Sequence, residues 1–173
     1  MGYRKDNVRH SRGHFDGPSV QKDKGDRAMK KELVQQVNSY VANLGVVYIK
    51  THNLHWNVFG LQFKAVHEYL EALYDAYTDN MDEVAELLAQ NGETPAASYK
   101  EFLELATIDD VPAKAWAVKD AIQTALDDMA ALKKQALEIR DACEDEDFAV
   151  ANTMEDQVAA YNKEIWFMKS MLK

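Results

Sequence analysis

The chain has 173 residues, 47% of them hydrophobic, which is enough for one sizeable core and indicates a single folded domain. Its one cysteine, Cys143, excludes an internal disulfide, and the lack of an apolar run of about 18 residues argues against a membrane span. The formal net charge of −9 is unevenly divided, because residues 1–31 carry nine Lys and Arg against four Asp (+5) and the remainder carries eleven against twenty-five acids (−14).

The first 27 residues are polar and hold four of the seven glycines. They lack the apolar segment of a secretion signal, so we expect a cytoplasmic protein. We also expect residues 1–27 to form a basic N-terminal arm and residues 28–173 to form the folded body. A basic arm suits polyanions, whereas an acidic body suits cations.

Apolar residues at spacings of three and four predict a first helix from about Met29 to Phe59, with Asp26 as a plausible cap. Gly60 interrupts this pattern, and a second helix is predicted over residues 62–90, ended by Asn91-Gly92. A small helix is expected over residues 98–105, within a long connection.

Pro112 precedes a third predicted helix over residues 113–143, and a fourth is predicted over residues 148–172. Seven Gly and three Pro are few for a strand-rich fold, which needs many turns. We therefore expect an all-α fold: a ferritin-like four-helix bundle with a short helix in the long connection between the second and third helices.

Candidate metal ligands concentrate in three short segments, THNLHWN at 51–57, VHEYLE at 66–71 and MDEVAE at 81–86. On the second helix, His67 and Glu71 are four residues apart, as are Asp82 and Glu86, so each pair shares a helical face. His55, near the end of the first helix, is positioned to join His67. Imidazole with carboxylate and no thiolate suits iron, manganese or zinc.

The two pairs cannot meet within one chain, because His67 and Asp82 stand roughly 22 Å apart along a helix that rises about 1.5 Å per residue. Either each subunit has two separate weak sites, or a two-fold related neighbour lays its second helix antiparallel and brings its Asp82 and Glu86 to this His67 and Glu71. A structural alternative is that His55 and His67 are packing residues and the acids are solvated helix charges.

The run HNLHWNVFG, the His67-Glu68 pair twelve residues after His55, and the later Asp82-x-x-Ala-Glu86 resemble the Dps family, also called miniferritins, over about residues 29–172. This resemblance implies a hollow, cytoplasmic and nucleoid-associated shell of twelve subunits. Iron(II) would be oxidised by hydrogen peroxide at inter-subunit sites holding two irons each, and ferric iron stored inside. The same resemblance implies that the catalytic and metal-binding residues are His55, His67 and Glu71 of one subunit with Asp82 and Glu86 of its partner.

Two positions depart from the family pattern, because family members usually have Asp at the place of Glu71 and commonly Arg at the place of Leu87. A carboxylate one methylene longer has an altered reach. The alternative function is therefore a DNA-binding, nucleoid-protecting structural shell with a weak or degraded ferroxidase site. A monomeric di-iron oxygenase is disfavoured, because no Glu-x-x-His occurs in the chain.

Other residues admit two interpretations each. Trp56 resembles the family's aromatic neighbour of the site, or it is a packing residue. His52 is more consistent with a surface or interface histidine than with a ligand.

Acidic residues crowd the link between the third and fourth helices. In the family, this link lines three-fold pores, so the acids either attract cations there or form a solvated turn. They are Glu138, Asp141, Glu144, Asp145, Glu146 and Asp147.

The basic arm has a composition that suits phosphate contacts and not base recognition. In several Dps proteins a Lys-rich N-terminal extension binds DNA, so the resemblance implies non-specific binding of double-stranded DNA, strengthened by many arms on one shell. The alternative is a solubilising tail. The candidate DNA-binding residues are Arg4, Lys5, Arg9, Arg12, Lys22, Lys24 and Arg27.

Overall fold

The computed structural model describes residues 28–173. The predicted arm, its seven candidate DNA-binding residues and the proposed cap Asp26 lie outside the described residues. The elements in chain order are α1 (Lys31–Asn57), β1 (Val58–Phe59), α2 (Phe63–Gln90), α3 (Tyr99–Leu105), β2 (Trp116–Ala117), α4 (Val118–Ala142), the single 3-10 turn η1 (Asp145–Asp147) and α5 (Phe148–Met171).

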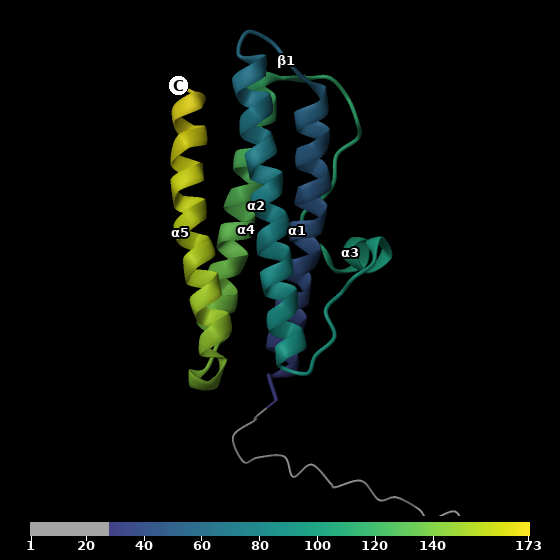
Figure 1. Cartoon of the computed structure of the whole chain (residues 1–173), viewed down its shortest axis with the longest axis vertical. Coiled ribbons are helices and arrows are strands. Elements are labelled where there is room, and N and C mark those ends of the chain that lie inside the picture. Colours follow the sequence, from purple (N-terminus) through teal and green to yellow (C-terminus); the bar gives the residue numbers. More distant parts are fainter. Residues whose placement is uncertain (1–27) are drawn as a thin grey trace, which may run out of the picture.

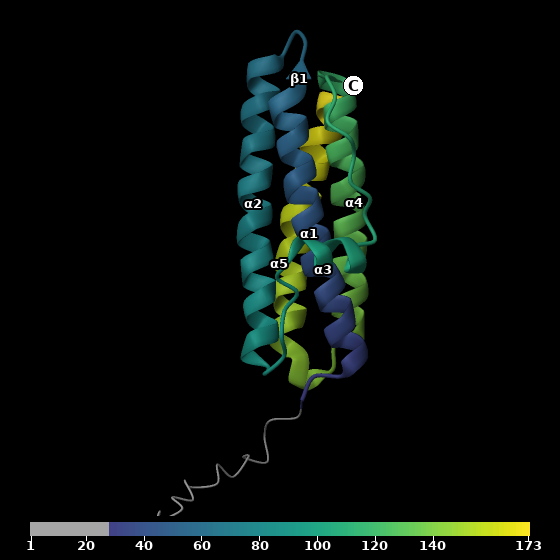
Figure 2. The same ribbon diagram turned by 90° about the vertical axis from the view of Figure 1, so that its right-hand side faces the viewer.

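Four long helices stand side by side and form the bundle that the sequence predicts (Figure 1). Helices α1 and α5 run in one direction, and α2 and α4 run in the other. Because α2 and α4 are parallel, the chain between them has to return along the whole bundle, and this connection carries α3 (Figures 1 and 2). The all-α fold with a short helix in the long connection is confirmed.

The predicted start of the third helix was wrong. Residues 113–117 are not helical, and α4 begins at Val118. Trp116 and Ala117 instead pair in parallel with Val58 and Phe59, and the Trp116 indole Nε1 donates to Asn53 Oδ1 at 3.4 Å. This pairing also ends α1 at Asn57, two residues earlier than predicted. It ties the turn between α1 and α2 to the start of α4.

The core is mostly apolar and includes a buried polar cluster around Tyr40. The Tyr40 hydroxyl donates to Gln157 Oε1 at 2.8 Å and lies 2.8 Å from the Tyr161 hydroxyl, to which Asn80 Nδ2 also donates at 3.2 Å. Burial raises the pKa of Tyr161 to about 12. These bonds satisfy hydroxyls that would otherwise be costly to bury, and they link α1, α2 and α5.

Helix α3 packs against α1 at a glycine (Figure 2). A Cβ atom added at Gly45 would lie 2.6 Å from Phe102 Cδ2, which is well inside van der Waals contact. At the start of α3, Ser98 Oγ accepts from the backbone N–H of Glu101 at 3.3 Å, a helix-capping bond. Gly45 thus sets how closely the connection approaches the bundle.

No helix in the described part of the chain is long and apolar enough to cross a lipid bilayer.

A buried ion pair joins α1 to α4. Lys50 Nζ donates to Asp128 Oδ1 at 2.8 Å and to the Asp109 carbonyl at 2.9 Å. Both side chains are less than a tenth exposed, at 8% and 7%. Burial raises the pKa of Asp128, while the Lys50 ammonium opposes that rise. Each charge depends on the other, because neither is in contact with bulk water.

We expect Lys50→Met to lower the free energy of unfolding by about 3–5 kcal/mol, because Asp128 would be left buried without its cation. The double variant Lys50→Met, Asp128→Leu should recover most of the loss, since no buried charge remains. The exposed pair Lys100–Glu104, 3.7 Å apart, is a matched control, and Lys100→Met should change stability by less than about 0.5 kcal/mol. Urea denaturation of the full chain measures all three, and equal effects at Lys50 and Lys100 would contradict this account.

Candidate metal centre

The end of α1 and the start of α2 bring two histidines into contact. Gly60, at φ 128°, allows the short reversal between these helices. His55 Nδ1 lies 2.8 Å from the His67 carbonyl, and His67 Nδ1 lies 2.9 Å from the His55 carbonyl. A carbonyl only accepts, so each Nδ1 donates, and in the neutral ring the free lone pair is on Nε2. Nε2 is therefore the nitrogen that each imidazole can offer to a metal ion.

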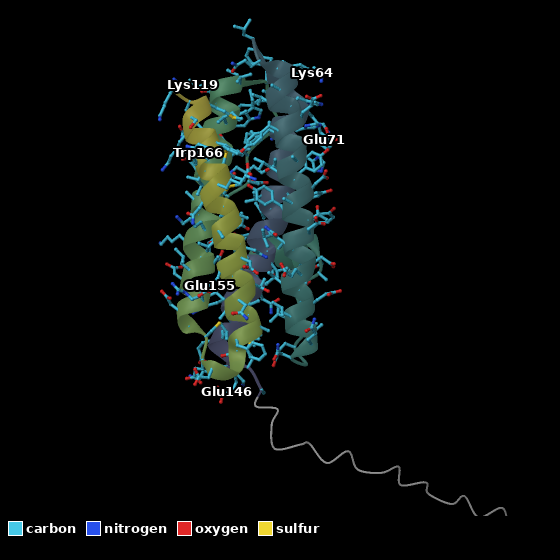
Figure 3. The ribbon with its side chains drawn as sticks, turned by 60° about the vertical axis from the view of Figure 1, so that its left-hand side comes forward. Lys64, Glu71, Lys119, Glu146, Glu155 and Trp166 are labelled. Atoms are coloured by element: carbon cyan, nitrogen blue, oxygen red, sulfur yellow. The ribbon has the colours of Figure 1, made fainter. Side chains whose placement is uncertain are left out.

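Glu71 completes a three-donor cluster, one helical turn beyond His67. The donor atoms of His55, His67 and Glu71 all lie within 4.8 Å of one another. His55 is buried, His67 is half-buried and Glu71 is exposed. Figure 3 shows Glu71 projecting from the outer side of α2. The cluster thus opens onto the surface of the bundle and not into its core.

The two imidazole rings are stacked, with centroids 3.6 Å apart and planes inclined by 20°. The Nε2 lone pair lies in the plane of its own ring, and metal–nitrogen distances are about 2.1 Å. Two nearly parallel planes at this spacing do not contain a common ion at that distance. The arrangement therefore favours one metal ion for each histidine.

Asp82 and Glu86 do not join this cluster within the chain. Among residues 28–173, the only group of three or more ligand-type side chains with metal-site geometry is His55, His67 and Glu71. Asp82 and Glu86 are both exposed farther along α2. Asp82 lines a groove of about 800 Å³ between α1, α2 and α3, together with Gly45, Tyr48, Tyr99 and others. Three of the five predicted site residues thus meet, and the other two are exposed farther along α2.

His52 lies in an aromatic cluster beside the site and outside the donor group. Its ring stacks on Tyr74 with centroids 3.8 Å apart, and it lies 4.8 Å from Trp56 and 4.6 Å from Tyr48. Burial lowers the pKa of His52, and the nearby His55 lowers it further, against the opposing charge of Asp75. Trp56 is 67% exposed. Tyr74 was not predicted as a neighbour of the site, although its position seven residues after His67 places it on the same face of α2.

The acidic turn between α4 and α5 is partly neutralised within the chain. Asp141 pairs with Arg140 at 2.9 Å, Glu138 with Lys134 at 3.6 Å, and Glu144 with Lys30. Figure 3 places Glu146 at this end of the bundle, far from Glu71.

Cys143 Sγ donates to the Ile139 carbonyl at 3.3 Å, and burial raises the pKa of its thiol to about 11. A partly buried thiol with a raised pKa has the character of a structural cysteine and not of a reactive one.

A family model for the ferritin-like domain matches residues 34–173. The chain is 34% identical to antigen TpF1 of Treponema pallidum over 142 residues, which cover 82% of this chain and 80% of that protein. It is 32% identical over 128 residues, 73% of this chain, to a DNA protection during starvation protein of Helicobacter pylori, of which 89% is covered. The chain belongs to the Dps family.

Solved structures of Dps proteins share the fold. A Dps protein from Bacillus brevis matches with a TM-score of 0.78 and 31% identity, over 84% of this chain and all of that one. A DPS protein from Vibrio cholerae, described as a member of a superfamily of ferritin-like diiron-carboxylate proteins, matches with a TM-score of 0.78 and 26% identity, over 83% of this chain and 90% of that one.

The cluster predicts metal binding that depends on His67 and not on His52. We expect His67→Ala to weaken cobalt(II) binding by more than about tenfold, because losing a ligand costs at least as much as losing a bond that supports one. The control His52→Ala should leave the affinity unchanged, since His52 lies one turn away and outside the donor group. The visible absorbance of bound cobalt(II) reports both, and an equal loss in the two variants would place the metal elsewhere.

Proposed function

We propose that this chain is a miniferritin that oxidises iron(II) with hydrogen peroxide and stores the ferric product in a hollow shell of twelve subunits. The observation that carries the proposal is the cluster of His55, His67 and Glu71, which opens onto the surface of the bundle and offers two imidazole Nε2 atoms and one carboxylate but lacks the ligands for two ions. Iron is the substrate and the cargo. The description of the Vibrio cholerae relative as a diiron-carboxylate protein supports two irons at each site.

A second copy of the chain would complete each site. In an isologous dimer, one surface meets itself, so a contact made by Asp82 with the partner is made twice. Two antiparallel α2 helices would bring the partner's Asp82 and Glu86 to His67 and Glu71. The groove beside Asp82 has exposed apolar side chains, with Ile49 at 46% and Tyr99 at 77% exposed, which a partner would cover.

The site residues suit a two-electron oxidant. Hydrogen peroxide accepts one electron from each of two iron(II) ions and, with two protons, becomes two water molecules, so no hydroxyl radical is released. His55 and His67, each held by the other's backbone, would bind separate ions. Carboxylates from both subunits would bind the ions and balance the charge of iron(III). The chain's own contribution is to hold two reductant ions close together.

A subunit-mixing experiment tests whether the site is shared. His67→Ala and the double variant Asp82→Asn, Glu86→Gln should each lose rapid peroxide-dependent iron oxidation. Co-assembled in equal amounts, half of the dimers would be mixed, and each mixed dimer would have one intact site. We therefore expect recovery of roughly a quarter of the wild-type rate, measured by ferric absorbance. A site contained within one subunit would show no recovery, and this result would refute the inter-subunit arrangement.

Glu71 decides between the proposed ferroxidase and a shell with a weakened site. Anaerobic iron(II) titration followed by peroxide should show fast, saturable oxidation in the wild type, and Glu71→Asp should change the rate by less than about tenfold, because both carboxylates reach an ion. If the wild type oxidises iron slowly and Glu71→Asp oxidises it fast, the alternative is favoured, a DNA-protecting structural shell with a degraded metal site. The departure at Glu71 from the family pattern is the observation behind that alternative.

We further propose that the arm binds double-stranded DNA non-specifically and that the shell acts in the cytoplasm, at the nucleoid. The sequence carries this proposal, because residues 1–31 have a net charge of +5 on an otherwise acidic chain. The printed name of the Helicobacter pylori relative, a DNA protection during starvation protein, supports it. The candidate contacts are Arg4, Lys5, Arg9, Arg12, Lys22, Lys24 and Arg27.

Deletion of residues 1–27 should abolish retention of duplex DNA in a gel-shift assay at low salt, while iron oxidation stays at the wild-type rate. Binding by the full chain should weaken steeply with added salt and be equal for unrelated sequences, because phosphate contacts release counterions. A variant with the seven arm cations replaced by Gln is the matched control for arm length. If both altered proteins still retained DNA, the helical body and not the arm would be the part that binds it.

A further inference from the structure

A second cavity lies between α2 and α5, apart from the candidate metal centre. These helices stand side by side in Figures 1 and 3. The cavity has a volume of about 430 Å³, within the size range of small-molecule sites. Three alanines, Ala72, Ala76 and Ala160, line it and leave space where larger side chains would close it.

The lining is mostly apolar and rich in aromatic rings. Tyr69, Tyr77, Tyr161 and Phe167 contribute rings, and Met129 is among the aliphatic lining residues. Flat ligands gain from such walls, because an aromatic ring buries a large area against another ring with little loss of conformational freedom.

Polar groups are few and differ in kind. The Tyr69 hydroxyl donates to Glu164 Oε2 at 2.7 Å, which leaves the carboxylate able to accept further hydrogen bonds. Tyr77 is 1% exposed, and its hydroxyl has no hydrogen-bond partner among residues 28–173. Its oxygen is closed off from the cavity space, so a ligand would pair with the Glu164 carboxylate instead.

The lining of the cavity selects against ions. Glu164 disfavours an anionic ligand. Burying any net charge against mostly apolar walls would also be expensive. We propose that the α2–α5 cavity binds a neutral, flat aromatic molecule that carries hydroxyl groups, of the phenol class. Its ring lies among the tyrosines, and a hydroxyl donates to Glu164.

This assignment is independent of iron oxidation, since none of the lining residues is a proposed metal ligand. It is tested by calorimetric titration of the metal-free, full-length protein with resorcinol, a neutral ring with two hydroxyls. We expect saturable binding of one molecule per chain. Ala76→Leu should weaken the affinity by at least about tenfold, because the larger side chain takes the place of the ligand at the cavity wall.

Two controls decide the outcome. Ala76 and Ala159 are both exposed helical residues, so leucine is tolerated at each, but Ala159 does not line the cavity. Ala159→Leu should therefore bind as the wild type does, and Glu164→Gln should bind about threefold or more weakly, because a charge-assisted bond becomes a neutral one. No saturable binding by the wild type, or equal affinities for the wild type and Ala76→Leu, would overturn the proposal. A loss in Ala159→Leu as large as in Ala76→Leu would do the same.

Discussion

The reciprocal hydrogen bonds between His55 and His67 are the contact on which the candidate metal centre depends. Each ring donates to the backbone of the other residue, so one pair of bonds fixes the tautomer of both, closes the turn between α1 and α2, and stacks the rings. Separate lysine or carboxylate partners would have fixed each ring individually. Here the backbone of each residue holds the ring of the other, so a shift of either helix end disturbs both bonds, and Glu71 joins the cluster one turn after His67 on α2.

Much of this fold could be predicted from sequence, because long helices with a regular apolar face carry a strong signal. The range Phe63–Gln90 was predicted to within one residue, since Asn91-Gly92 marks its end. The start of α4 was not, because the pairing of Trp116 with Val58 joins segments that are distant in sequence. Two-residue strands have no periodicity to detect.

The candidate site, like the fold, could be predicted from sequence only in part. Spacing along α2 and the family resemblance were sufficient to select His67 and Glu71 and to separate them from Asp82, since helical rise alone keeps these groups apart. Ring stacking, the tautomers and the packing of His52 on Tyr74 were beyond the sequence, because they depend on side-chain rotamers in the folded state. The unequal burial of the donors, from buried His55 to exposed Glu71, is likewise a property of the packed bundle.

The short parallel pairing of β1 with β2 has a consequence for the order of folding. Helices α1 and α2 are joined by five residues and can form a hairpin early, from local contacts. The strand that fastens their turn arrives only after the long connection has crossed the bundle and α4 has begun. The three clustered donors all lie on this hairpin, and the strand pairing adds a late, non-local support to the turn beside them. A nascent chain would therefore hold its donors on an unsecured hairpin until residues 116–117 pair with β1.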